Sequence, residues 1–373
     1  MGSACKLQEV AMKYFNLLAL LFLLTGCKGG GSGGGWPSVL SEQIIVNLDA
    51  RPALGIRELV LETTRVEARR ALYGNWIEIS QSGSPRPPLG AYDALRIQIG
   101  SGSRVATADG SYAGPLALPP DLANGLTVPV DFTVSSGQWT SINLLFDTLQ
   151  SLQAQPAGSA SPYLFRPTFR VFNGFGGNQN GLVWKRSATT PLPLAMVTAQ
   201  VPRAPDPPEI LEWGLTSPAQ TQWSLMYLPL GQPVCLVATH TGQDVCVPKA
   251  SIKTLNQVIN TMIEFTLATV PLAGSVQGRV TPVPGPDQAD LILVLQDLEV
   301  APGRSEQLIV ARVLPILAAE ETFTVPSLAP GSYQLCVLRR SFGASGAESS
   351  RSHAWSPSCL VVAGQSTSMD LAF

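Results

Sequence analysis

The chain has little of the side-chain chemistry that enzymes and nucleic-acid-binding proteins depend on. Only two of its 373 residues are histidine, 13% are Asp, Glu, Lys or Arg, and the formal net charge is −2. Scarce histidine leaves little material for acid–base catalysis or transition-metal ligation. Without a basic field, nucleic-acid binding is not expected. We therefore expect a protein that is not an enzyme, with no cofactor, no metal and no nucleic-acid partner.

A hydrophobic run long enough to cross a bilayer is also missing. The run from Tyr14 to Leu24 is shorter than the roughly 20 residues that a spanning helix needs, but it fits the core of a secretory signal. Lys13 precedes the run, and Leu24-Thr25-Gly26-Cys27 closes it. This order resembles a bacterial lipoprotein signal over residues 1–27, which implies cleavage before Cys27 and lipidation of its thiol. A plain signal peptide or short anchor helix that happens to contain a cysteine is the alternative.

Residues 28–41 follow as a glycine-rich tether, with the run Gly29-Gly30-Gly31-Ser32-Gly33-Gly34-Gly35. Lys28 directly after the cysteine implies, in lipoprotein families of the enteric type, sorting to the outer membrane. We therefore expect an exported protein anchored by lipid to the cell envelope, with the membrane as its first partner.

Four cysteines remain for the body of the chain: Cys235, Cys246, Cys336 and Cys359. An even count in an exported protein indicates disulfides, and four cysteines allow three pairings. We favour Cys235–Cys246 and Cys336–Cys359, because each pair brackets one local hairpin-like segment. A zinc site is the alternative, although neither pair has the two-residue spacing of a zinc knuckle.

The body is predicted to be all-β, as three β-sandwich modules in series. The chain has 34 glycines and 31 prolines, and turn residues such as Ser136-Gly137 separate stretches in which apolar residues alternate. Arg57 to Leu72 has some helical spacing, but its β-branched residues favour a strand. The clearest alternating sets are Ile44, Val46, Leu48; Leu95, Ile97, Ile99; Leu126, Val128, Val130, Phe132, Val134; and Ile142, Leu144, Phe146.

The first module, residues 42–173, resembles a bacterial lipoprotein family registered as domain of unknown function 4382. The resemblance rests on Ile45-Val46-Asn47-Leu48-Asp49-Ala50-Arg51-Pro52, Tyr92 to Ile97, Leu144 to Asp147 and Leu164 to Val171. Arg51 departs from the usual Asp-Ala-Pro. The resemblance implies a β-sandwich in an exported lipoprotein and carries no known activity.

An internal repeat follows a predicted linker at residues 174–191. Trp223 to Gly231 parallels Phe323 to Gly331, with aromatic, aliphatic, leucine and glycine positions at the same offsets. We place the opening strand of the first copy at Met196 to Val201 and that of the second at Ser275 to Val280. A chance match of one hairpin is the alternative.

The second copy, residues 271–373, resembles the transthyretin-like, carboxypeptidase-regulatory-like β-sandwich. The residues are Gly274-Ser275-Val276-Gln277-Gly278-Arg279-Val280, Phe323 to Tyr333, and Val362 to Thr367. The first copy, residues 192–270, is a more divergent match to this family, and we expect it to lack the opening glycines of the second copy. The resemblance implies that this module is a stalk, a spacer or an accessory that contacts sugars.

No motif for catalysis stands out. Gly30-Gly31-Ser32-Gly33-Gly34 matches the sequence pattern of a nucleophile elbow. That elbow needs a strand before it and a helix after it, whereas this run lies in the glycine tether. His240 is read as a solvated hairpin tip and His353 as part of a polar loop. Two aspartate pairs, Asp287 with Asp290 and Asp49 with Asp147, could meet a calcium ion but are read as turn or solvated residues.

Sugar recognition would need exposed aromatic platforms. Trp184 and Trp355 are expected to be flanked by loop residues and rank first as candidate ligand platforms. The other candidates are Trp76, Trp139 and Trp213, whereas Trp223 in the repeat is expected in the core.

The leading hypothesis is a non-enzymatic, lipid-anchored envelope protein that presents β-sandwich modules for binding or adhesion to an envelope glycan or protein. The alternative is a carbohydrate-binding accessory lipoprotein that serves a surface enzyme. A hydrolase with an unrecognised carboxylate pair is a third hypothesis.

Anchoring can be tested at the predicted lipidation site. Cys27→Ala removes the thiol that would carry the lipid, so the protein should move from the detergent phase to the aqueous phase in a cloud-point partition. Cys336→Ala serves as the matched control and should leave the partition unchanged. Equal partition of the wild-type and Cys27→Ala proteins would rule out the anchor.

Overall fold

The computed structural model describes residues 43–51, 56–79, 87–107, 110–155, 158–174, 176–186, 192–216, 222–240, 245–257, 260, 262–285, 287–313, 322–343 and 348–373. Strands make up 68% of the structure and helices 3%. The all-β prediction is therefore confirmed. The predicted signal, Cys27 and the tether lie outside the described residues.

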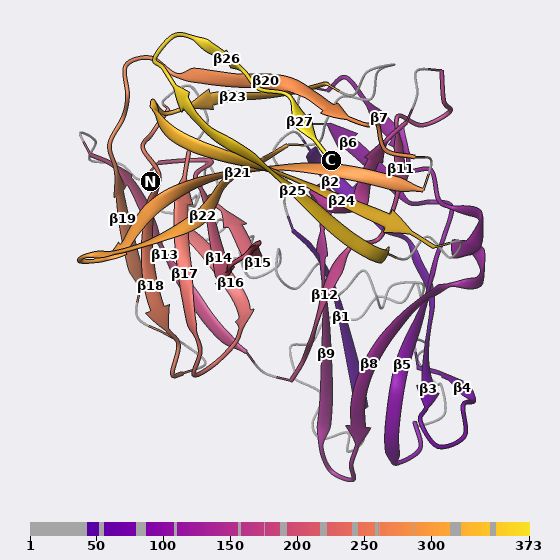
Figure 1. Ribbon diagram of the computed structural model, residues 1–373. Coiled ribbons are helices and arrows are strands. Elements are labelled where there is room, and N and C mark those ends of the chain that lie inside the picture. Colours follow the sequence, from indigo (N-terminus) through magenta and orange to yellow (C-terminus); the bar gives the residue numbers. More distant parts are fainter. Residues whose placement is uncertain are drawn as a thin grey trace, which may run out of the picture. The chain divides into compact units, whose positions relative to one another are not determined.

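The described strands form two compact units. Unit 1 contains β1–β9 and β12, and unit 2 contains the segment Thr148–Thr168 and everything from β13 onward. The chain thus passes into unit 2 after Asp147, returns to unit 1 for β12 and then enters unit 2 again (Figure 1). The second and third predicted modules share unit 2.

Unit 1 is built from three sheets, and the predicted alternation is confirmed in β8 but not in β9, which is buried at every position from Ile142 to Asp147. In β8, every second residue from Leu126 to Val134 is buried, and Leu95 and Leu144 are fully buried on β5 and β9. Arg57–Leu72 contributes strands β2 and β3, as predicted. The sheets are β4 (Trp76–Glu78), β3 (Thr63–Arg70), β5 (Gly90–Ile99), β8 (Leu126–Val134); β1 (Gln43–Arg51), β9 (Trp139–Asp147), β12 (Phe169–Asn173); and β2 (Ile56–Val60), β6 (Arg104–Thr107), β7 (Ala113–Pro115).

Unit 2 contains two copies of one seven-element sandwich. Each copy has a three-stranded sheet, widened in the second copy by β27, and a four-stranded sheet in the same order. The first copy is β16 (Gln222–Leu228), β13 (Gly177–Lys185), β19 (Ile263–Leu267) and β15 (Asp206–Leu215), β14 (Met196–Arg203), β17 (Pro233–Thr239), β18 (Lys249–Thr254). The second is β23 (Thr322–Leu328), β20 (Gly274–Thr281), β26 (Ser366–Ser368) with β27 (Leu371–Ala372), and β22 (Arg304–Val313), β21 (Gln288–Ala301), β24 (Gly331–Phe342), β25 (Glu348–Val361).

The first copy opens with β13, which corrects two sequence predictions. Residues 177–185, which were predicted to be linker, form the central strand of the three-stranded sheet. Met196–Val201, predicted to be the opening strand of the first copy, lies in β14, which is equivalent to β21 of the second copy and not to β20. β13 carries glycines at positions 177 and 181, four apart like Gly274 and Gly278 of β20. The opening glycines are therefore present in both copies.

These paired glycines explain how each three-stranded sheet closes. Gly181 pairs with Trp223, and a Cβ at position 181 would overlap the carbonyl oxygen of Ile263. Gly278 pairs with Phe323, and a Cβ there would overlap the carbonyl oxygen of Met369. Only glycine lets the third, parallel strand approach this closely.

The four-stranded sheet of the first copy is buried on both faces. Val234, Leu236 and Ala238 of β17 lie in the core of the first copy. Cys235 and Val237, the alternate residues, lie in the core of the second copy. Gln200 of β14 joins the copies by donating to the carbonyl of Ile309 at 2.7 Å and accepting from its amide at 2.9 Å.

The segment Thr148–Thr168 is held by the second copy. It forms α2 (Thr148–Ser151), β10 (Leu152–Ala154) and β11 (Tyr163–Phe165). Arg340, which is fully buried, donates from Nη1 to the carbonyl of Gln150 at 2.6 Å and to the Thr168 hydroxyl at 2.7 Å. Gln153 donates to the carbonyl of Gln288 at 3.0 Å. Side-chain bonds to backbone carbonyls therefore fix a segment with short strands.

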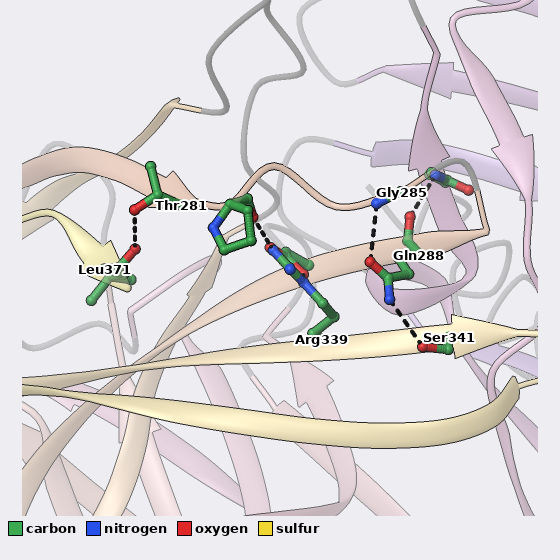
Figure 2. A network of polar contacts seen from close by, with 9 residues as sticks. Thr281, Gly285, Gln288, Arg339, Ser341 and Leu371 are labelled. Carbon is green, nitrogen blue, oxygen red and sulfur yellow. Dashed lines mark hydrogen bonds and ion pairs between the residues drawn. The ribbon is translucent and has the colours of Figure 1, made fainter. Parts of the chain in front are cut away.

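A buried ion pair fixes the connection between β20 and β21. Arg339 donates to both carboxylate oxygens of Asp290, at 2.8 and 2.7 Å, and to the carbonyl of Pro282 at 2.6 Å. Gln288 accepts from the amide of Gly285 and donates to Ser341 (Figure 2). Because removing one partner would leave a buried charge unpaired, this pair constrains the local conformation strongly.

The close approach at Gly278 predicts a large stability effect. Gly278→Ala should lower the free energy of unfolding by about 1–3 kcal/mol or more, because the new methyl group must push β26–β27 or β23 aside. Urea unfolding measures the change. Gly285→Ala is the matched control, since its Cβ would meet only ordinary contacts, the nearest at 3.7 Å. Equal stability of the two variants would contradict the packing argument.

Candidate functional site

The four cysteines of the body are buried and form no disulfide with one another in the described part of the chain, so the predicted pairings are wrong. Cys235 lies in the core of the second copy, whereas Cys246 lies in the core of the first. Cys336 and Cys359 project to opposite faces of the sheet that contains β24 and β25. A disulfide needs Cα atoms within about 7 Å and facing side chains. Bracketing a hairpin in sequence did not provide that geometry.

Trp184 and Trp355, the candidate ligand platforms, are both partly buried. Trp355 packs against the cluster that contains Cys336 and Leu338, and its ring lies 5.9 Å from that of His353. Trp184 lies on β13, where its indole N–H is buried without a hydrogen-bond partner among the described residues. Neither is among the exposed large hydrophobic side chains of the described chain. Their proposed role as platforms stays a prediction.

Several polar candidates have structural partners. His240, predicted to be solvated, is buried, and its Nε2 lies 3.1 Å from the carbonyl of Pro193. His353 lies in β25 and not in a loop. Asp290 is committed to Arg339, while Asp287 lies 3.5 Å from Arg166, so the two aspartates do not share a site.

For the other pair, the side chain of Asp49 lies outside the described residues, and Asp147 is buried. Within the described ranges, no group of three or more His, Cys, Asp or Glu side chains could hold a metal ion. Among the same residues, no helix has the length and hydrophobicity to span a bilayer.

One end of unit 1 concentrates exposed apolar side chains. The relative exposures are 79% for Leu72, 65% for Tyr73, 48% for Leu89 and 44% for Trp139. In the described part of unit 1, these four are all of the exposed large hydrophobic residues. We call this set the apolar end.

Strand register brings the three loops of the apolar end together. Arg70, at the end of β3, pairs with Tyr92 near the start of β5, and Gly90 pairs with Val134 at the end of β8. The β3–β4 turn, the segment before β5 and the β8–β9 turn therefore lie at the same end of the sheet (Figure 1). Leu72 and Tyr73 occupy the first turn, Leu89 the second segment, and Trp139 follows the third.

Arg70 holds two parts of the apolar end in place. Its Nη2 donates to the carbonyl of Leu89 at 3.2 Å, and its guanidinium carbon lies 4.7 Å from the centre of the Tyr73 ring. The amide of Gly74 donates to the carbonyl of Arg70 at 2.8 Å, which closes the turn. These contacts preorganise the exposed side chains, and preorganisation lowers the entropic cost of binding.

A charged network adjoins the apolar end on β3, β4 and β5. Glu67, buried on this face, accepts from Arg96 at 2.6 Å and from Arg65 at 3.0 Å. The guanidinium of Arg96 lies over the ring of Trp76, 4.4 Å from its centre. The ion pairs and the cation–π contact fix the Trp76 ring beside polar groups. Trp76 and Trp139 were both candidates from the sequence, and the structure places Trp76 on β4 and Trp139 at the start of β9, in two different sheets of unit 1.

Comparisons with known proteins found distant similarity in structure alone. No family model matches, and no curated protein matches. The chain is similar in structure to the Bacillus anthracis TIE protein, with 11% identity, a TM-score of 0.20 and coverage of 89% of this chain and 50% of that one. A streptococcal ancillary pilin has 11% identity and a TM-score of 0.21, with 89% and 99% of the two chains covered.

A putative cell adhesion protein from Bacteroides fragilis has 10% identity and a TM-score of 0.20, with 53% and 90% covered. The chain spans half the length of the Bacillus anthracis protein. TM-scores this low do not support transfer of a function. The all-β assignment rests on the strands described above, and the resemblances to two families stay predictions.

The buried thiols predict a loss of stability in base. Burial raises the pKa of Cys235 to about 11 and that of Cys336 to about 12, from a usual 9.0, and it raises the pKa of Tyr333 to about 12. The folded state holds these protons more tightly than the unfolded state does. Their contribution to the free energy of unfolding is therefore complete below about pH 9 and is lost as the pH rises toward 11–12. Urea unfolding at pH 8 to 11 should show a falling free energy.

Cys336→Val provides the test of cause, because it removes a titrating group at similar volume. The variant should show a shallower decrease of unfolding free energy between pH 9 and 11 than the wild-type protein. An unchanged slope would mean that this thiol does not contribute to the pH dependence.

Proposed function

We propose that this protein is a non-enzymatic, lipid-anchored protein of the cell envelope that binds a surface macromolecule through the apolar end of unit 1. The observation that carries the proposal is the exposure of Leu72, Tyr73, Leu89 and Trp139 on adjoining loops. Exposed apolar residues that gather at one end of a domain are candidates for an interaction site, whereas single exposed hydrophobic residues scattered over the surface need no explanation.

The composition of the apolar end fits a binding surface. Tyrosine, tryptophan and arginine are the residues that dominate binding energy in protein interfaces. Tyr73 and Trp139 supply aromatic area, and Arg70 is fixed between Tyr73 and the carbonyl of Leu89. The ion pairs around Glu67 form a polar border beside this centre. An apolar centre with a polar rim is the usual organisation of an interface.

Location is part of the proposal and rests on the sequence. The signal-like run that ends at Cys27 and the glycine tether 28–41 support export, lipid attachment and an outer-membrane address. A flexible tether would let the body reach a partner on a neighbouring surface.

A carbohydrate-binding accessory lipoprotein is the second candidate. It is favoured by two tryptophans near one end of unit 1: Trp139, which is exposed, and Trp76, whose ring is fixed beside Arg96 and Arg69. Sugars stack on such rings while polar neighbours bond their hydroxyls. On a glycan array, binding that is lost in Trp139→Ala would favour this candidate over a protein ligand.

The binding role of the apolar end can be tested with purified protein and isolated envelope fragments. The double variant Leu72→Ser/Tyr73→Ser removes the two most exposed side chains and leaves the core intact. Co-sedimentation should show binding at least about tenfold weaker than wild type, as expected when interface anchors are removed.

Leu360→Ser is the matched control, because Leu360 is 65% exposed but lies in unit 2. It should bind like the wild-type protein. If the double variant binds as well as the control, the apolar end is not the binding surface.

A further inference from the structure

The first copy in unit 2 has an open side between its two sheets. β18 is the edge strand of the four-stranded sheet, and β19 is the edge strand of the three-stranded sheet. A groove of about 470 Å³ lies between them, lined by Lys249, Ser251 and Lys253 on β18 and by Ile263, Glu264 and Phe265 on β19. We call it the edge groove.

The side chains of β18 are sorted by face. Ala250 and Ile252 pack against the core of the second copy. Lys249, Ser251 and Lys253, the alternate residues, therefore project to the other side, toward β19. Strand register agrees, because Lys249 and Lys253 pair with Ala238 and Val234, which belong to the core of the first copy. Two lysines, whose Cα atoms lie about 13 Å apart along the strand, thus line one wall of the groove.

The charges in the groove are not balanced. Lys249 and Lys253 are exposed and form no ion pair with any described residue, and Glu264 is the only acidic residue on the lining. At the base of the groove, Phe265 is buried and Ile263 packs against the core of the first copy. A ligand that fills the groove must therefore supply negative charge opposite β18.

The second copy has the same two edges but closes them. There, residues 362–365 connect β25 directly to β26, and the hydroxyl of Thr367 donates to the carbonyl of Leu360 at 3.0 Å. In the first copy, the connection from β18 to β19 is longer, residues 255–262. The first copy is also joined at one end of these edges, where the amide of Val247 donates to the carbonyl of Ala268 at 2.8 Å and that of Val270 to the carbonyl of Val245 at 2.9 Å. The edge groove lies between this junction and the longer connection.

We propose that the edge groove receives an extended segment of an acidic partner protein, which adds as a strand to β18. An edge strand presents unpaired N–H and C=O groups that can pair with an incoming strand. The lysines select a segment with two acidic residues four positions apart, with a small or apolar residue between them opposite Ser251. This partner site is independent of the apolar end of unit 1.

Lysines on an edge strand also have a protective role, because they prevent pairing with a second copy of the same chain. The two roles differ in a measurable way. Protection predicts that no peptide binds, whereas a partner site predicts binding that depends on the sign of the peptide charge.

The test uses the full chain and a fluorescent peptide, Thr-Thr-Glu-Thr-Val-Thr-Glu-Thr-Thr, with a second peptide in which lysine replaces both glutamates. Anisotropy should show at least about tenfold tighter binding of the glutamate peptide, and this preference should shrink at high salt. Hydrogen exchange should show added protection of backbone amides in β18. Equal binding of the two peptides, or no protection in β18, would overturn the proposal.

Charge reversal identifies the residues. The variant Lys249→Glu/Lys253→Glu should invert the preference, so that the lysine peptide binds more tightly than the glutamate peptide. Arg351→Ser is the control, because it removes an exposed cation from the second copy, and this variant should bind like the wild-type protein. An unchanged preference in the reversed variant would overturn the proposal. Concentration-dependent dimers that protect β18 would do so as well, because the occupant would then be a second copy.

Discussion

Burial of β-sheets on both faces is the constraint on which the rest of unit 2 depends. The sheet β15-β14-β17-β18 faces the core of the first copy on one side and the core of the second on the other. A sheet in this position loses the alternation of polar and apolar residues, and β17 is buried at every position after its first. The polar groups that remain must pair, as Gln200 does with the backbone of Ile309.

The same constraint explains the cysteines. On a strand that is buried on both faces, neighbouring residues enter different cores, so two cysteines close in sequence can be separated by a sheet. Cys235 and Cys246 lie in different cores for this reason, and Cys336 and Cys359 lie on opposite faces of one sheet. Each thiol is instead a small apolar group, and burial raises the pKa of Cys235, Cys336 and Cys359.

Unit 2 has two kinds of surface although its two copies share one strand order. Both copies keep the glycine pair that lets a parallel strand approach, and both have a residue of positive φ at equivalent positions, Tyr227 at 57° and Ser327 at 58°. They differ at the edges of their two sheets, where residues 362–365 connect β25 to β26 in the second copy, whereas a longer connection, residues 255–262, follows β18 in the first beside the lysine-lined edge groove. A module that keeps its core while its edges vary can separate stability from binding.

The sequence by itself determined strand β8 of unit 1, because one face of that strand is exposed and the alternation of Leu126 to Val134 records it. It also determined the existence of the repeat, since aromatic, leucine and glycine positions recur from Trp223 and from Phe323. The tertiary structure alone decided that the first copy begins at Gly177 and that the cysteines stay apart. It also decided that the segments bearing Leu72, Tyr73, Leu89 and Trp139 lie at one end of unit 1, because strand register and two-sided burial depend on contacts between residues distant in sequence.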